Sequence, residues 1–200
     1  MKRFILAFIL SLVIVAALPL LSADDASDAR YYPLAVGNVW TYEVRLFSPK
    51  AKRSSVKWTV THSDIWHGRN VYQVWPKPMD VDDEAMLLAI TPQGIVETTD
   101  ETYLLRFPIT AGDTWTQTPR GSNRSLSFLV RSANQPCQVN GHRVSACVVV
   151  EQDDSATGLK TVTTYGRDIG PVHYDYYKQQ AGKDNLIQSV SLVAHKVAVP

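Results

Sequence analysis

The sequence predicts an all-β protein with at most one short helix: a single antiparallel, strongly curved sheet, or an open barrel or sandwich, of roughly ten to twelve short strands. Apolar side chains recur along the chain with a period of two rather than the helical period of about 3.6. Turn-forming residues separate these runs at the spacing that is typical of sheet proteins. After residue 23, no segment has the composition of a linker, so one domain is expected.

The N-terminal residues 1–23 have the pattern of a signal peptide. Lys2 and Arg3 precede an apolar run over 4–21, and Leu-Ser-Ala at 21–23 offers a cleavage site of small residues. The run is also just long enough to span a bilayer, so an uncleaved anchor in the inner membrane is the alternative. We expect cleavage, because Pro19 and the small-residue end fit processing better than a stop-transfer segment. The protein is then exported, to the periplasm or beyond.

The rest of the chain is expected to be an extended lead-in at 24–31 and a single β-rich domain at 32–200. The clearest strand covers 39–46, where Trp40, Tyr42 and Val44 share one face and polar side chains share the other. If the domain contains a helical turn, residues 80–88 are the segment where we expect it. Further strands are expected at 56–61, 71–75, 85–90, 95–99, 103–107, 125–131, 144–151, 159–165, 172–177 and 186–197.

One pattern occurs twice: YPLAVGNVWT at 32–41 and FPITAGDTWT at 107–116, an offset of 75 residues. Proline ends a preceding ladder, and glycine followed by Asn or Asp permits a tight turn. The tryptophan can then bury a large area as the new strand begins. We interpret the pattern as a strand-starting corner that is used twice; a duplicated half-domain is the alternative.

The same residues carry a resemblance. The opening Y-P-L-x-x-G-N-x-W-x-Y at 32–42, its second copy, V-N-G-H-R-V-S-A-C at 139–147 and Y-G-R-D-I-G-P-V at 165–172 resemble a broad group of exported bacterial β-sheet proteins and lipoproteins of unassigned function. The resemblance implies a bacterial origin and a sheet curved around a core, in the manner of the open barrels of periplasmic lipid carriers. The chain departs from the lipoproteins of this group because no Cys follows its apolar N-terminal run.

Catalytic, metal-binding and cofactor motifs are not recognisable in the sequence. None of the five histidines has a partner at the spacing of a zinc site. His173 and Asp175 share a strand face, where a polar cross-strand surface is the simplest interpretation and an acid–base or metal pair the alternative. The acidic run at 80–84 lacks the Gly and Glu of a calcium loop. We therefore predict no catalytic residues, no metal ligands and no cofactor.

Aromatic residues are the candidates for ligand binding. A sheet curved around a cavity would line it with the same residue types that fill a core. Strand positions and strand starts hold most of the tryptophans of the chain. The ligand-binding candidates are Trp40, Tyr42, Trp58, Trp75 and Trp115.

The two cysteines, Cys137 and Cys147, invite a disulfide in an exported protein. Asn-Gly at 140–141 predicts a two-residue hairpin in which Cys137 faces Val144 and Cys147 faces Asn134. An offset of three residues is about 10 Å, beyond the roughly 4.4–6.8 Å that a disulfide allows between Cα atoms. A bulge near Pro136 would remove the offset. We expect the bond; the alternative is two thiols with Cys147 buried.

Charge balance limits the partners. Residues 1–23 carry two of the 20 Lys and Arg and none of the 19 Asp and Glu, which leaves 18 against 19, a net charge of −1. A near-neutral domain has no electrostatic footprint for nucleic acid. We expect an exported, non-enzymatic cell-envelope protein, a binding or structural module that carries an apolar small ligand or contacts an envelope protein. A hydrolase that acts on glycans or esters of the envelope is the alternative. Membrane contact is expected only if the N-terminal segment stays uncleaved.

Overall fold

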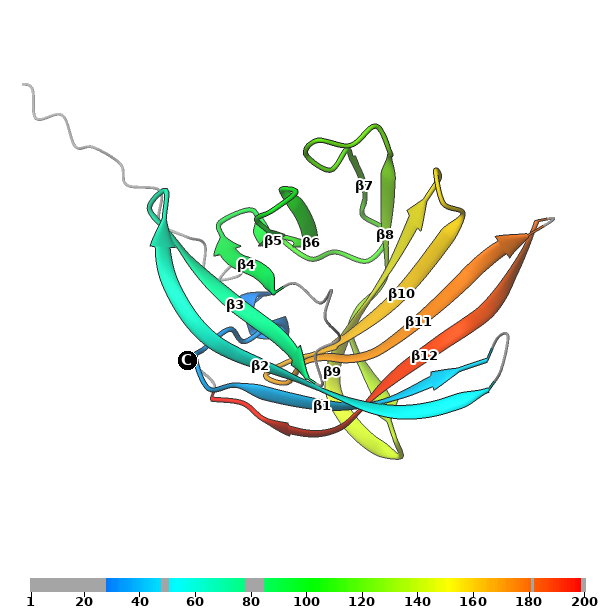
Figure 1. The fold of residues 1–200 in the computed structure, drawn as a ribbon, viewed down its shortest axis with the longest axis horizontal. Helices are drawn as coiled ribbons and strands as arrows, with labels where there is room; N and C mark the ends of the chain where they lie inside the picture. Colours follow the sequence, from blue (N-terminus) through cyan, green and yellow to red (C-terminus); the bar gives the residue numbers. More distant parts are fainter. Residues whose placement is uncertain (1–27, 48–50, 78–84, 181, 199–200) are drawn as a thin grey trace, which may run out of the picture.

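The computed structural model of the chain describes residues 28–47, 51–77, 85–180 and 182–198. These residues form a 12-stranded antiparallel sheet that curves into a nearly closed barrel, preceded by one short 3-10 helix (Figure 1). The elements in chain order are the helix Ala29–Tyr31, β1 (Val39–Leu46), β2 (Lys52–Trp66), β3 (Arg69–Lys77), β4 (Met86–Thr91), β5 (Gly94–Glu97), β6 (Thr102–Arg106), β7 (Thr114–Gln117), β8 (Leu126–Val139), β9 (His142–Asp154), β10 (Leu159–Gly166), β11 (Gly170–Gln180) and β12 (Lys183–Lys196).

The order of the strands across the sheet is β6-β5-β4-β3-β2-β1-β12-β11-β10-β9-β8-β7. The sheet therefore consists of two consecutive meanders, β1 to β6 and β7 to β12, which are joined where β12 pairs with β1. The predicted all-β class and single curved antiparallel sheet are confirmed. The helical turn expected at 80–88 is wrong in its last part, because Met86 and Leu88 alternate with Leu87 in strand β4; residues 78–84 lie outside the described residues.

The barrel remains open along one seam. In the described part of the chain, no backbone ladder joins the edge strands β6 and β7. The Tyr103 N–H donates to Gln117 Oε1 (3.1 Å), and Gln117 Nε2 donates to the Tyr103 carbonyl (3.2 Å). The side-chain amide of Gln117 thus satisfies edge groups that an adjacent strand would otherwise pair.

Inward-facing side chains form the main core. Trp40, Val60 and Leu88 lie on three different strands and are fully buried. Their strand neighbours face outward, as the period-two pattern predicts. The fold thus depends on an apolar interior that the curved sheet encloses.

Residues before β1 form a plug in the barrel, at the end where β1, β7 and β11 begin. Tyr31 and Tyr32 are buried in the core. The Tyr31 hydroxyl donates to Asn134 Oδ1 on β8 (2.7 Å). The Ile109 N–H, from the segment between β6 and β7, donates to Asp28 Oδ2 (2.7 Å). We call residues 28–34 the plug.

The extended lead-in expected at 24–31 is wrong for its last residues, and 24–27 lie outside the described residues. Ala29–Tyr31 form a helical turn instead. The Arg30 guanidinium forms an ion pair with Asp168, and the Asp168 N–H donates to the Arg30 carbonyl (2.8 Å). These contacts direct Tyr31 into the core, so the packed part of the chain includes residues 28–31 and does not begin at 32.

The two copies of the repeated pattern form the same corner. The Gly37 N–H donates to the Val60 carbonyl (2.9 Å), and the Val60 N–H donates to the Asn38 carbonyl (2.9 Å). In the second copy the Gly112 N–H donates to the Val130 carbonyl (2.8 Å), and the Val130 N–H donates to the carbonyl of residue 113 (2.9 Å). Each meander therefore begins with one such corner, and backbone hydrogen bonds join that corner to the second strand of the same meander.

Glycine is required at both corners, since Gly37 has φ 91° and Gly112 has φ 90°. We predict that Gly37→Val and Gly112→Val each lower the free energy of unfolding by about 1–3 kcal/mol. A Cβ atom would meet nothing within 4 Å at either site, so the cost is backbone strain alone. Chemical denaturation measures the change, and Gly112→Asn, which tolerates positive φ better, should lose less. Equal stability of Gly112→Val and the parent chain would contradict the assignment.

Candidate functional site

A hollow of about 260 Å³ lies in the barrel interior, and Tyr32 of the plug forms part of its lining. We call it the inner hollow. Side chains from both meanders line it. Its aromatic residues are Tyr32, Trp58, Phe128, Tyr165, Tyr174 and Tyr176.

The aromatic rings of the inner hollow contact one another. The ring of Trp58 lies 5.6 Å from that of Tyr174, which stacks on Tyr176 at 6.3 Å. Trp58 and Tyr176 nevertheless remain partly exposed, as do Met86 and Leu104. The described residues therefore leave some apolar surface of the hollow uncovered.

The inner hollow carries no formal charge, because its lining contains no Asp, Glu, Lys or Arg. Gln152 and Thr161 supply polar groups. Burial raises the pKa of Tyr165, Tyr174 and Tyr176 above the usual value of a tyrosine, so these phenols stay neutral. Such a site suits a neutral, largely apolar ligand with few hydrogen-bonding groups.

Of the five aromatic candidates from the sequence, Trp58 lines the inner hollow. Tyr42 lies behind it in the wall, with its ring 5.1 Å from that of Trp58 and its hydroxyl donating to the Pro171 carbonyl (2.9 Å). Trp40 is fully buried, and its indole N–H donates to the Ile169 carbonyl. Trp40 therefore packs the core.

The other two candidates lie apart from the inner hollow. Trp115 stacks on Phe128 at 4.8 Å, and only Phe128 reaches the lining. Trp75 is half-buried and follows Val74, which faces the core, so Trp75 lies on the outward face of β3.

Sequence reasoning missed all four tyrosines that line the inner hollow. Tyr174 and Tyr176 alternate with His173, Asp175 and Tyr177 along β11, which places the first pair inward with the core. This alternation was a usable signal. Tyr32 gave no such signal, because it precedes the first strand and reaches the hollow only through the plug.

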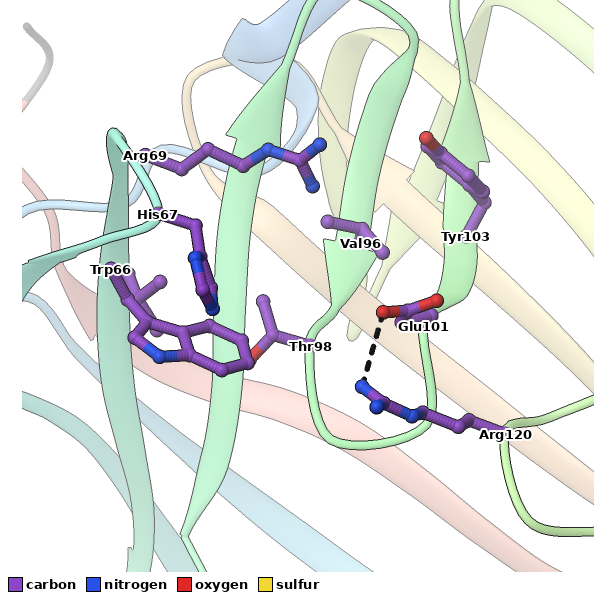
Figure 2. Close-up of a pocket in the computed structure, with 9 residues that line it drawn as sticks. Trp66, His67, Arg69, Val96, Thr98, Glu101, Tyr103 and Arg120 are labelled. Carbon is purple, nitrogen blue, oxygen red and sulfur yellow. Dashed lines mark hydrogen bonds and ion pairs between the residues drawn. The ribbon is translucent and has the colours of Figure 1, made fainter.

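A second hollow lies on the outer face of the barrel, beside the turn between β2 and β3, and measures about 480 Å³ (Figure 2). We call it the outer hollow. Figure 2 shows Trp66 and His67 on one side of it and Tyr103 on the other, with Arg69 extending above. Unlike the inner hollow, it carries charged side chains.

His173 and Asp175 form part of a hydrogen-bonded chain on the outward face of β11 and β12. His173 Nδ1 lies 2.9 Å from Ser191 Oγ, and His173 Nε2 lies 3.1 Å from Asp175 Oδ1. Desolvation alone raises the pKa of the Asp175 carboxyl, but hydrogen bonds from His173, Ser189 and Tyr177 outweigh it and hold that pKa below its usual value. The carboxylate therefore stays ionised.

Ser191, His173 and Asp175 are the residue types of a catalytic triad, yet the geometry is unsuited to acyl transfer. Both strands have paired neighbours on each side, and Ser191 lies opposite Glu43 on β1 and His173 on β11, so its backbone is part of the sheet ladders. The serine also sits on Nδ1 of the imidazole, where triads place the carboxylate. The set stabilises the contact between β11 and β12.

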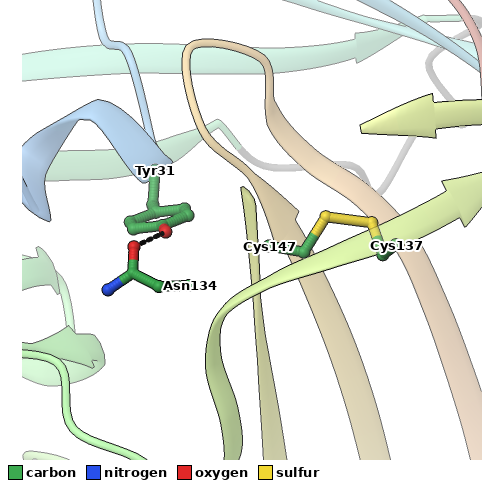
Figure 3. The surroundings of a disulfide bond; sticks show 4 residues. All are labelled: Tyr31, Asn134, Cys137 and Cys147. Carbon is green, nitrogen blue, oxygen red and sulfur yellow. Dashed lines mark hydrogen bonds between the residues drawn. A yellow bond between two sulfur atoms is a disulfide. The ribbon is translucent and has the colours of Figure 1, made fainter. Parts of the chain in front are cut away.

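The expected disulfide joins Cys137 on β8 to Cys147 on β9, with 5.9 Å between the Cα atoms (Figure 3). The register places Cys137 opposite Val144 and Gln135 opposite Cys147, with a shift between the two pairs. The bulge expected near Pro136 is therefore present, and it removes the offset that a regular hairpin would impose.

Neither a metal site nor a membrane-spanning helix is found among the described residues. Within them, no group of His, Cys, Asp and Glu is arranged to hold a metal ion. Nor does any helix in these ranges have the length and apolar character needed to cross a bilayer.

Two solved bacterial structures resemble the fold. One, from Bacteroides fragilis, is classed as an exported protein with a YmcC-like fold; it covers 82% of this chain and 98% of its own, with TM-score 0.52 and 12% identity. The other, from Parabacteroides distasonis, is classed as a lipoprotein; it covers 83% of this chain and 98% of its own, with TM-score 0.44 and 9% identity. The first likeness shows a shared fold.

No family model and no curated protein matches the sequence. The curved β fold implied by the resemblance to exported bacterial proteins is confirmed. The shared motifs at 32–42, 139–147 and 165–172 stay a prediction.

The buried phenols of the barrel interior give the protein a specific alkaline sensitivity. Their pKa is raised in the folded chain, so stability is complete below the pKa of an unfolded tyrosine, about 10, and falls as the pH rises above it. We predict a loss of about 1.4 kcal/mol per pH unit for each tyrosine that stays neutral in the fold. Tyr176→Phe should reduce that slope in denaturation curves measured between neutral and strongly alkaline pH. An unchanged slope would show that this phenol ionises in the folded protein.

Proposed function

We propose that the protein is an exported, non-enzymatic binding module of the bacterial cell envelope that holds a neutral, apolar small ligand in the inner hollow. The observation that carries the proposal is the partly exposed apolar surface inside the barrel. Trp58, Met86, Leu104 and Tyr176 line the interior, yet each is only partly buried among the residues that the structure describes. A ligand that covers them gains about 25 cal/mol for each Å² of apolar surface removed from water.

The lining favours a neutral ligand. A charged group in the inner hollow would lose hydration without meeting an opposite charge, which is costly in a low-dielectric site. Phenol, hydroxyl and amide groups from Tyr174, Thr161 and Gln152 can satisfy one or two polar atoms. An aromatic ring or the end of an acyl chain that carries a hydroxyl or carbonyl group meets these requirements.

The volume and the plug limit how the ligand binds. At about 260 Å³ the inner hollow lies just below the range of about 300–1,000 Å³ that is common for ligand pockets. The plug fills the end where β1, β7 and β11 begin. The ligand is therefore small, or only its apolar end enters, from the opposite end of the barrel.

Three observations support export. Residues 1–23 have the pattern of a signal peptide, and the disulfide between Cys137 and Cys147 suits an oxidising compartment. The solved structure from Bacteroides fragilis with a similar fold is classed as exported. Retention of the N-terminal segment would instead tether the barrel to the inner membrane.

The alternative, a hydrolase of envelope glycans or esters, has weaker support. Its best candidate group, Ser191 with His173 and Asp175, lies on the outward face, and the serine contacts Nδ1 of the imidazole, where a triad places the carboxylate. The inner hollow has no carboxylate pair for glycoside hydrolysis.

Native mass spectrometry of the protein extracted from its own envelope tests export and binding in one spectrum. We predict a protein mass that begins at or within a few residues of Asp24, together with a neutral ligand in a one-to-one ratio. An intact Met1 would establish the anchor. A protein that arrives empty and hydrolyses an ester substrate, with the activity lost in Ser191→Ala, would overturn the proposal.

Two tryptophan variants then locate the ligand. N-phenyl-1-naphthylamine, a neutral apolar fluorophore, serves as the probe. Trp58→Ala should weaken its binding about tenfold, which corresponds to about 1.4 kcal/mol. Trp75→Ala removes a tryptophan from the outward face of the neighbouring strand and should leave binding within about twofold. Equal losses in the two variants would place the probe elsewhere.

A further inference from the structure

The outer hollow is built by a hairpin turn that projects from the sheet. His67 and Gly68, between β2 and β3, have φ 50° and 74°. Two successive positive φ values are typical of the tight turn that favours β-hairpins. Trp66 and Arg69 are therefore paired across the hairpin and both line the outer hollow. Trp66 is 50% exposed, although it is the largest apolar side chain of the turn.

The floor of the outer hollow is apolar. Val71, Ala89 and Val96, on β3, β4 and β5, form a hydrophobic cluster that is separate from the main core, and each side chain is less than a tenth exposed. The register places Val71 opposite Ala89, Ala89 opposite Val96, and Val96 opposite Tyr103. An apolar row thus crosses four strands beneath the turn, with Trp66 at one end and Tyr103 at the other.

Arg69, Glu101 and Arg120 line the outer hollow, and Asp64 lines the hollow that adjoins it. Arg120 contacts Glu101 at 3.4 Å, but both side chains are about two-thirds exposed, so the pair contributes little. Arg69 forms no ion pair among the described residues. Figure 2 shows its guanidinium extended over the hollow toward Val96 and Tyr103. An unpaired guanidinium directed over an apolar floor favours an anion attached to an apolar body.

An adjoining hollow of about 550 Å³ lengthens the site, since both hollows share Trp66, Val71, Thr98 and Arg120. The second hollow reaches Leu87. Together they form a groove that is long enough for an extended apolar group, with Arg69 near one end.

We propose that the outer hollow is a second ligand site, which binds a carboxylate attached to an aromatic or aliphatic body. The apolar body lies on Val71 and Val96 between Trp66 and Tyr103, and the carboxylate accepts hydrogen bonds from Arg69. A free aromatic acid and a fatty acid share this chemistry. This site is independent of the inner hollow, whose uncharged lining disfavours carboxylates.

Binding of two acids to the full chain tests the proposal. 2-Naphthoate represents a free aromatic acid, dodecanoate represents a fatty acid, and 2-naphthol is the matched neutral probe. We expect at least one acid to bind, and Arg69→Ala to weaken that acid about tenfold while leaving 2-naphthol within about twofold. Arg143→Ala removes an exposed arginine from the β8–β9 hairpin and should leave the binding of every probe unchanged. Trp66→Ala should weaken the acid and 2-naphthol alike, because it removes a wall of the groove.

Every result of these binding measurements either supports or overturns the proposed outer site. Binding of 2-naphthoate alone assigns the site to small aromatic acids, and binding of dodecanoate alone assigns it to acyl chains; both support the site. The proposal is overturned if neither acid binds, if Arg69→Ala and Arg143→Ala cause the same loss, or if the acid displaces N-phenyl-1-naphthylamine from the inner hollow. Rejection of the outer site leaves the proposal for the inner hollow untouched, since that proposal rests on Trp58 and a neutral probe.

Discussion

Packing of the plug inside the barrel is the contact on which the rest of the structure depends. The plug binds the turn between β10 and β11 through Arg30 and Asp168. The same turn accepts the indole N–H of Trp40, and a Cβ on its Gly170 would lie 3.1 Å from that indole nitrogen. Strand β1, the turn between β10 and β11 and the plug are therefore packed against one another, and a change in one affects the other two. Because β1 joins the two meanders through β12, this fit also fixes the closure of the sheet.

A plug at one end gives the two faces of the sheet different chemistry. Inside, the core is filled around Tyr32, and the apolar surface beyond it stays uncovered at Trp58 and Tyr176. On the other face, the row from Val71 to Tyr103 is apolar, and the turn between β2 and β3 lies beside it. The inner hollow is lined by uncharged residues, whereas Arg69, Glu101 and Arg120 line the outer hollow, so we propose that the two bind ligands of different charge.

Local patterns in the sequence were sufficient to predict the fold class, but they did not predict the long-range contacts. Period-two alternation in 39–46 and 172–177 predicts strands, and the Gly-Asx-x-Trp pattern predicts both corners, because each depends on neighbouring residues. The bulge at Pro136 could be inferred from proline chemistry together with the cysteine spacing. The plug could not, since the Tyr31 hydroxyl donates a hydrogen bond to Asn134, which lies 103 positions further along the chain. Trp58 was a candidate for the inner hollow, whereas the outer hollow depends on Trp66 on β2 and Tyr103 on β6, which are brought together only by the pairing of five strands, β2 to β6.

We propose that a ligand completes the apolar interior of the barrel. A crystal structure of the protein, purified from its own envelope without delipidation, is the decisive measurement. We expect continuous density for a small molecule against Tyr32, Trp58 and Tyr174. An empty interior in which Trp58 and Tyr176 have closed over the inner hollow would contradict it.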